Sequence, residues 1–100
     1  MRIVARKALL DFISDHPDSE VAMEDWFERT ENAQWDCFAD LRRSFNSADY
    51  VGNKSVVFNI KGNHYRLVAI VLYRIKMVYI RFIGTHREYD KLTEEQIKNI

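Results

Sequence analysis

The fold of this chain is decided by residues 56–90, VVFNIKGNHYRLVAIVLYRIKMVYIRFIGTHREYD. Three runs rich in apolar and β-branched residues lie within this stretch, at 56–60, 64–73 and 77–83. The turn residues Lys61-Gly62-Asn63 separate the first two runs, a pattern that predicts a β-hairpin. The third run should return antiparallel to the second. The stretch therefore predicts three consecutive antiparallel strands that end in a Gly-Thr-His turn at residues 84–86.

The first half of the chain has a different periodicity. Apolar residues recur there at helical spacing, and the first predicted helix must end before Pro17 because proline interrupts helices. Ile3 and Val4 predict a short first strand, and residues 48–51 predict another. Helices followed by strands predict one α+β domain over residues 1–100. We expect the N-terminal helices to pack on one face of a four- or five-stranded, mainly antiparallel sheet.

Two capping patterns predict where the last helices begin. Thr85 and Glu88 have the spacing of a capping box, in which a threonine and a glutamate each bind the other's backbone N–H. This box places His86 at the first position of a helical turn. Thr93 and Gln96 repeat the signal and predict a terminal helix.

Composition excludes several classes of protein. No apolar stretch reaches the roughly 20 residues of a membrane helix, and the N-terminus has no signal-peptide pattern. The single Cys37 excludes an internal disulfide and suits a reducing compartment, so we expect a cytoplasmic protein without a membrane partner. Three histidines and one cysteine show no metal-site spacing, and we therefore expect neither a metal nor another cofactor.

The zero net charge hides an asymmetry along the chain. Residues 1–50 hold six basic and eleven acidic side chains, whereas residues 51–91 hold eight basic and two acidic ones. The first part thus carries −5 and the second +6, and the last nine residues supply −1. Salt screens charges beyond about 8–10 Å, so the local charge governs attraction to phosphate. We expect a basic sheet surface that can bind RNA.

Two arginines, Arg66 and Arg81, lie inside predicted strands with apolar neighbours. Such an arginine usually occupies an exposed face or pairs with a carboxylate. A two-residue turn between the strands would place both arginines on one face, and a three-residue turn would separate them. Both registers give an apolar core face, so the sequence does not decide between them. We favour the first register because it assembles a cationic site.

Three motifs carry a resemblance to a known family: FNIKGNHYRLV (58–68), VYIRFIG (78–84) and THREYD (85–90). They resemble the HigB toxins of bacterial toxin–antitoxin pairs, within the RelE superfamily of ribosome-dependent mRNA interferases. ARKALLDF (5–12) and SADYVGNKSVVFNIKGN (47–63) are similar to that family as well. The resemblance covers nearly the whole chain and implies a RelE-like fold and endoribonuclease activity.

Metal-free RNA cleavage needs a base for the ribose 2′-OH, cations for the phosphorane and an acid for the 5′ oxygen. We expect His86 to transfer the proton, because histidine, with an ordinary pKa near 6.5, serves as acid or base. Arg66 and Arg81 would stabilise the charge, and Tyr89, one helical turn after His86, would stack on a base or orient the phosphate. The alternatives are a solvated surface histidine and a tyrosine packed on the sheet edge. The predicted RNA-binding residues are Lys61, His64, Arg87 and Lys91.

The resemblance also implies partners. They are the ribosome, mRNA and a HigA-like antitoxin with a helix-turn-helix fold. The toxin would contact operator DNA only through this antitoxin. Two other functions remain open. The chain could be a non-catalytic RelE- or ParE-fold toxin or co-repressor that acts by protein binding, although such relatives generally lack this basic, His and Tyr combination. It could also be an RNA-binding module without cleavage, for which we expect a more uniformly basic chain.

Overall fold

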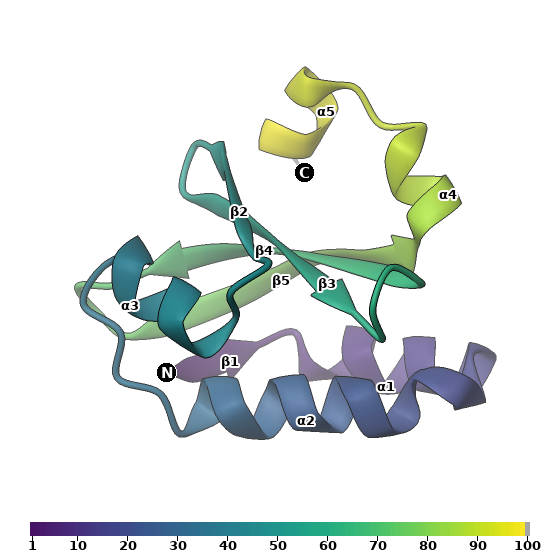
Figure 1. Cartoon of the computed structure of the whole chain (residues 1–100), viewed down its shortest axis with the longest axis horizontal. Coiled ribbons are helices and arrows are strands. Elements are labelled where there is room, and N and C mark those ends of the chain that lie inside the picture. The colour runs from purple at the N-terminus through teal and green to yellow at the C-terminus, as the bar shows by residue number, and fades with distance from the viewer. Residues whose placement is uncertain (100) are drawn as a thin grey trace.

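One five-stranded sheet organises the computed structural model, which describes residues 1–99 (Figure 1). The strands are β1 (Arg2–Val4), β2 (Asp49–Gly52), β3 (Ser55–Ile60), β4 (Tyr65–Leu72) and β5 (Met77–Thr85), in the spatial order β1-β5-β4-β3-β2. Strands β2 to β5 pair antiparallel with their neighbours in sequence. Strand β1 pairs parallel with β5, a pairing that the sequence pattern did not indicate. The predicted α+β fold with a mainly antiparallel sheet is confirmed.

The N-terminal helices lie side by side against one face of the sheet, as predicted (Figure 1). They are α1 (Arg6–Asp15) and α2 (Glu20–Glu31), joined by the short 3-10 turn η1 (Pro17–Ser19), and α3 (Phe38–Ser44) follows. Trp26 of α2 is buried and meets Phe58 of β3 edge to face, with ring centroids 5.4 Å apart. Each fully buried large apolar side chain contributes roughly 1.5–3 kcal/mol, so this helix–sheet interface forms the main core. Within residues 1–99, no helix has the length and apolar character needed to span a bilayer.

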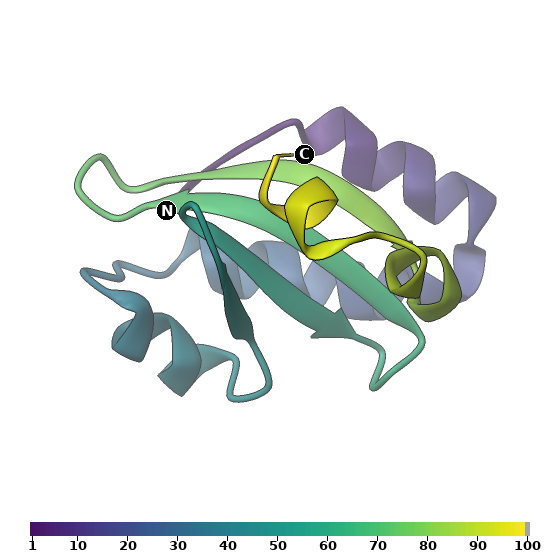
Figure 2. The ribbon, with the colours of Figure 1, turned by 90° about the horizontal axis from the view of Figure 1, so that it is seen from above.

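Two short helices cover part of the opposite sheet face (Figures 1 and 2). They are α4 (His86–Asp90) and α5 (Glu94–Lys98), and each begins with the capping box that the sequence predicts. Beneath them lies a second, smaller apolar cluster. Its buried members are Val57, Val68 and Ile97, and Phe82 and Tyr89 pack against it. The segment that carries the predicted His86 is therefore fixed to the sheet by this second cluster.

A bulge in β5 changes the register between the two arginine-bearing strands. The turn over residues 73–76 pairs Leu72 with Met77, and the same register continues to Ala69 opposite Ile80. The register then shifts, and Arg66 pairs with Gly84. The favoured register thus holds only at the turn end of the hairpin, and Arg81 occupies the bulge itself. A bulge adds one residue to a strand and redirects the side chains that follow it.

Candidate active site

The candidate site lies where β4 begins and β5 ends, beside α4. The backbone N–H of His86 donates to the carbonyl of His64 at 3.0 Å, which ties the start of α4 to the β3–β4 turn. The hydroxyl of Thr85 accepts from the Glu88 N–H at 3.1 Å, and the Glu88 carboxylate accepts from the Thr85 N–H at 2.8 Å. The bond from the Thr85 N–H to the carboxylate, followed by the Thr85 side chain, holds the pKa of Glu88 below its ordinary value. Backbone geometry therefore fixes His86 before any substrate binds.

Arg66 is buried, with 8% of its surface exposed. Its guanidinium donates to two neutral oxygens, the Tyr65 carbonyl at 3.2 Å and the Asn63 side-chain oxygen at 3.5 Å. Among residues 1–99, no carboxylate lies within 4.0 Å of it. Burying a charge costs several kcal/mol unless an opposite charge compensates it. A bound anion such as phosphate would supply that opposite charge. This agrees with the role that the sequence predicts for Arg66, the stabilisation of charge on an RNA phosphate.

Tyr89 is partly buried and packs against the second cluster. Its ring centroid lies 6.5 Å from that of Phe82. Burial raises the pKa of Tyr89 most, the Arg66 charge opposes this rise, and the Asp49 and Asp90 carboxylates add to it. The phenol therefore stays protonated at neutral pH and is a poor base but a competent hydrogen-bond donor. Tyr89 packs against the second cluster on the sheet, as the structural alternative held, and its pKa responds to the charge of Arg66.

His86 is half-exposed, and its Nδ1 lies 2.6 Å from the carboxylate of Asp90. This contact holds the imidazole ring in one orientation. Because Nδ1 is engaged, any proton exchange with a substrate falls to Nε2. Sequence reasoning missed Asp90, although its i,i+4 spacing from His86 on a helix was a usable signal.

Lys61 is paired within the protein. Its Nζ lies 2.9 Å from the carboxylate of Asp18, which also accepts from the Tyr65 hydroxyl at 2.7 and 2.8 Å. The bond from Tyr65, followed by that from Lys61, holds the pKa of Asp18 below its ordinary value. An RNA phosphate that binds Lys61 must therefore compete with Asp18, a residue that sequence reasoning also missed. No local spacing links Asp18 to the β3–β4 turn.

The other predicted cations are distributed unevenly around the site. The exposed His64 places Nδ1 2.8 Å from the Lys61 carbonyl, and Arg87 and Lys91 are exposed on α4 and at its end. The exposed Arg81 lines a different hollow, of about 240 Å³, with Asp11 and Asp15 of α1. Within the described residues, no three His, Cys, Asp or Glu side chains are grouped as a metal site. The structure thus gathers the predicted residues around α4 and the start of β4, except Arg81.

The comparisons with known proteins all indicate the same family. A family model described as HigB toxin, the RelE-like toxic component of a toxin–antitoxin system, matches residues 19–92. This range includes every predicted site residue. The chain is 31% identical over 104 residues to the mRNA interferase toxin HigB of Escherichia coli (strain K12), covering 93% of this chain and 91% of that protein. The mRNA interferase HigB of Shigella flexneri matches with the same identity and coverage. The mRNA interferase HigB of Escherichia coli O6:H1 (strain CFT073) is 24% identical over 101 residues, covering 99% of this chain and 98% of that protein.

Proposed function

The chain belongs to the HigB family of RelE-like toxins of toxin–antitoxin systems, and from this membership we propose that it is an mRNA interferase. In this proposal it is an endoribonuclease that inhibits translation by cutting mRNA. The relatives named mRNA interferase support the activity. The structural observation that carries the proposal is the buried guanidinium of Arg66, which has only neutral partners among residues 1–99.

The proposed reaction is attack of the ribose 2′-OH on the adjacent phosphate, in which a P–O2′ bond forms and the P–O5′ bond breaks. The 2′-OH proton passes to solvent water, and the leaving 5′ oxygen takes up a proton, which gives a cyclic phosphate and a free 5′ hydroxyl. Negative charge grows on the phosphorane oxygens, and a fixed cation in a water-poor site stabilises such charge more than the ground state. We assign this role to Arg66. We assign His86 as the principal proton-transfer residue, acting as the general acid on the leaving 5′ oxygen through Nε2. Asp90 is then a positioning residue that holds the imidazole in place.

The remaining residues have supporting roles in the proposal. Tyr89, protonated at neutral pH, donates to the phosphate or stacks on a base. Lys61, His64, Arg87 and Lys91 bind the RNA backbone, and Lys61 does so by exchanging Asp18 for phosphate. Arg81 adds positive potential from the α1 side of β5. This part for Arg81 is smaller than the sequence suggests, because Arg81 lies in the bulge and shares a hollow with two carboxylates.

We further propose that cleavage takes place on the ribosome, in the cytoplasm. The zero net charge supports this, because the chain lacks the uniform basicity with which a protein captures free RNA. The ribosome would present the mRNA to the local basic surface. Membership in a toxin–antitoxin family implies an antitoxin partner. We propose that this antitoxin is a helix-turn-helix, HigA-like protein that alone contacts operator DNA.

The test is induction of the chain in cells, followed by mapping of mRNA 5′ ends. Growth arrest with new ends inside coding regions is the expected outcome, and the His86→Gln protein should produce neither. Purified toxin should then cut mRNA bound to programmed ribosomes and leave the same RNA uncut without ribosomes. Arrest without new mRNA ends would instead identify a non-catalytic toxin that acts by protein binding.

A further inference from the structure

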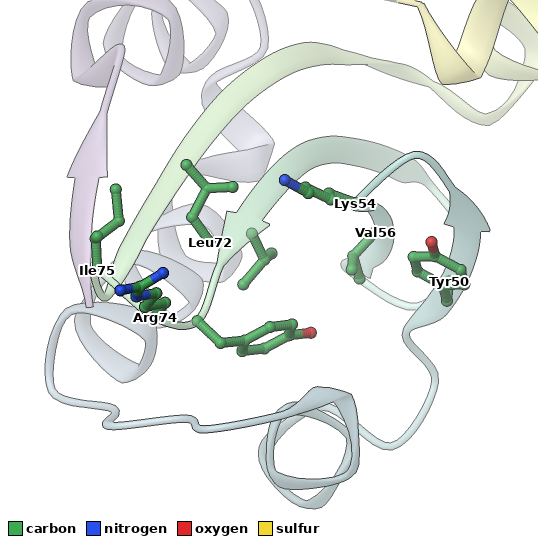
Figure 3. A pocket seen from close by; sticks show the side chains of 8 residues that line it. Tyr50, Lys54, Val56, Leu72, Arg74 and Ile75 are labelled. Atoms are coloured by element: carbon green, nitrogen blue, oxygen red, sulfur yellow. The ribbon is translucent and has the colours of Figure 1, made fainter.

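A second concave surface lies at the other end of the sheet, beside the β4–β5 turn (Figure 3). It has a volume of about 410 Å³, which is within the range of ligand and side-chain pockets. Its floor is aliphatic and includes the buried Val56 of β3 and Val71 of β4. At its rim stand Tyr50 and Ile75, each with 57% of its surface exposed. We call this surface the turn pocket.

The turn pocket exists because β4 is longer than its neighbour β3. The β3–β4 ladder ends at Ser55 opposite Ile70, while β4 continues to Leu72, which pairs only with β5. The space that a longer β3 would fill lies between the β4–β5 turn and β2. Helix α3 reaches the rim of this space, where Phe38 packs against Tyr50. A single exposed apolar residue is ordinary on a protein surface, but exposed apolar side chains around an aliphatic hollow mark an interaction site.

Two cations come to this hollow from separate turns. Lys54 belongs to the β2–β3 turn and Arg74 to the β4–β5 turn, and both line the hollow in Figure 3. Among residues 1–99, neither has a carboxylate within 4.0 Å. The pocket therefore offers an apolar cavity between two cations that have no acidic partner in this part of the chain. A partner of complementary chemistry carries a large apolar side chain next to carboxylates.

An RNA segment fits these features less well than a protein segment. The aliphatic side chains of Val56, Val71 and Leu72 provide no hydrogen-bond donors or acceptors, and besides the rim and the two cations the lining offers a nucleotide only the hydroxyl of Tyr73. Entry of a base would therefore leave most of its polar edge unpaired. The ring of Tyr50 is already packed against Phe38, with centroids 6.1 Å apart, which removes part of its surface for stacking. A leucine- or phenylalanine-sized side chain loses no hydrogen bonds in such a cavity. The observations therefore favour a protein partner.

We propose that the turn pocket binds an acidic segment of the antitoxin, which inserts one large apolar side chain and sets carboxylates against Lys54 and Arg74. The proposal rests on membership in a toxin–antitoxin family and not on the nuclease activity. The end of the pocket at the β4–β5 turn lies far from Arg66, although Tyr50 at the rim also lines a separate hollow with Tyr89. Leu72 lies six residue steps along β4 from Arg66, which at about 3.4 Å per step is roughly 20 Å. Substitutions at the pocket should therefore change antitoxin affinity and leave cleavage unchanged.

The first test measures the Kd of the purified antitoxin encoded beside this toxin, by calorimetry, for two pocket variants. Ile75→Asp places a charge at the apolar rim and should weaken binding at least about tenfold. The double variant Lys54→Glu/Arg74→Glu should weaken it more and should lose the salt dependence of the wild type. The matched controls are Leu10→Asp, also on a half-exposed apolar residue, and Lys7→Glu on the surface of α1. Both controls should stay within about twofold of wild type.

Thermal unfolding of every variant and mRNA cleavage without antitoxin show whether each protein remains folded and active. Wild-type cleavage together with weakened antitoxin binding supports the proposal. An unchanged Kd in both pocket variants would overturn it. Loss of ribosome or RNA binding with an unchanged Kd would overturn it as well, and would make the pocket an RNA surface. Because the Kd is measured without RNA, a chain that proves to lack nuclease activity still tests this inference.

A photo-crosslinking residue at position 75 identifies the bound segment directly. The crosslinker at position 75 should capture the antitoxin, and the same group at position 10 should not. Mass spectrometry of the product should map an antitoxin segment that holds a large apolar residue within a few positions of aspartate or glutamate. Capture of a segment without carboxylates would contradict the assigned partner chemistry.

Discussion

Truncation of Arg66 tests whether this arginine acts in catalysis or only stabilises the fold. The guanidinium has two hydrogen bonds to neutral oxygens and, among residues 1–99, no carboxylate partner. Removing one member of a buried ion pair costs about 3–5 kcal/mol because a bare charge remains. Arg66→Ala leaves no such charge. It gives up two bonds from a charged donor, worth about 1.5–3 kcal/mol each, but it also removes the cost of burying a charge without a carboxylate partner, which is on the order of several kcal/mol. We therefore expect the free energy of unfolding to fall by only about 1–3 kcal/mol.

The activity of the same variant should fall much further. Loss of one fixed donor to a developing oxyanion costs about 10²–10³ in rate. Arg66→Lys is the matched variant, because it keeps the charge but not the planar fork of donors, and its rate should lie between those of wild type and alanine. The assay is single-turnover mRNA cleavage on programmed ribosomes, with urea unfolding of each protein. A near-wild-type rate for Arg66→Ala, or a loss of activity explained fully by unfolding, would refute the reasoning.

Four further substitutions test other parts of the structure. His86→Gln should lower the cleavage rate by about 10²-fold or more while antitoxin affinity stays constant, and a near-wild-type rate would remove this residue from the mechanism. Because the pKa of Asp18 is lowered in the folded protein, its stabilising effect is present above the unfolded pKa of about 3.9 and disappears as the pH falls through the folded pKa. The difference in unfolding free energy between wild type and Asp18→Asn should therefore shrink from pH 7 to pH 3, and an equal difference at both pH values would contradict this contact. Gly84→Ala puts a Cβ 2.6 Å from the ring of Phe82. The free energy of unfolding, measured in urea, should therefore fall by about 1–3 kcal/mol, and an unchanged value would mean that the ring moves freely. Burial raises the pKa of Tyr73 to about 12, so the free energy of unfolding should fall as the pH rises from about 10 towards that value. Tyr73→Phe should remove this fall in alkaline unfolding curves, and a fall that persists in the variant would mean that another group causes it.

Sequence reasoning placed the local structural elements correctly wherever the signal was local. The capping box at Thr85 predicted the start of α4 and the place of His86 because its two hydrogen bonds join residues three positions apart. Of the two interpretations of Tyr89, the structure shows the packed aromatic, and its role in stacking on a base or orienting the phosphate stays a prediction. Sequence reasoning missed Asp18, whose bonds to Lys61 and Tyr65 span more than forty residues. No periodicity in a chain records a contact across that separation.

The sequence by itself determined the strands, the helices and the family, because alternation, helical spacing and caps depend on hydrogen bonds and packing within a few residues. Tertiary structure alone decided the bulge at Arg81, which separates that arginine from Arg66 although both lie on paired strands. Both registers give an apolar core face, so only the packing of the whole sheet against its two helical layers selects one. The burial of Arg66 without a carboxylate partner among residues 1–99, on which the proposed mechanism depends, is a result of that same packing.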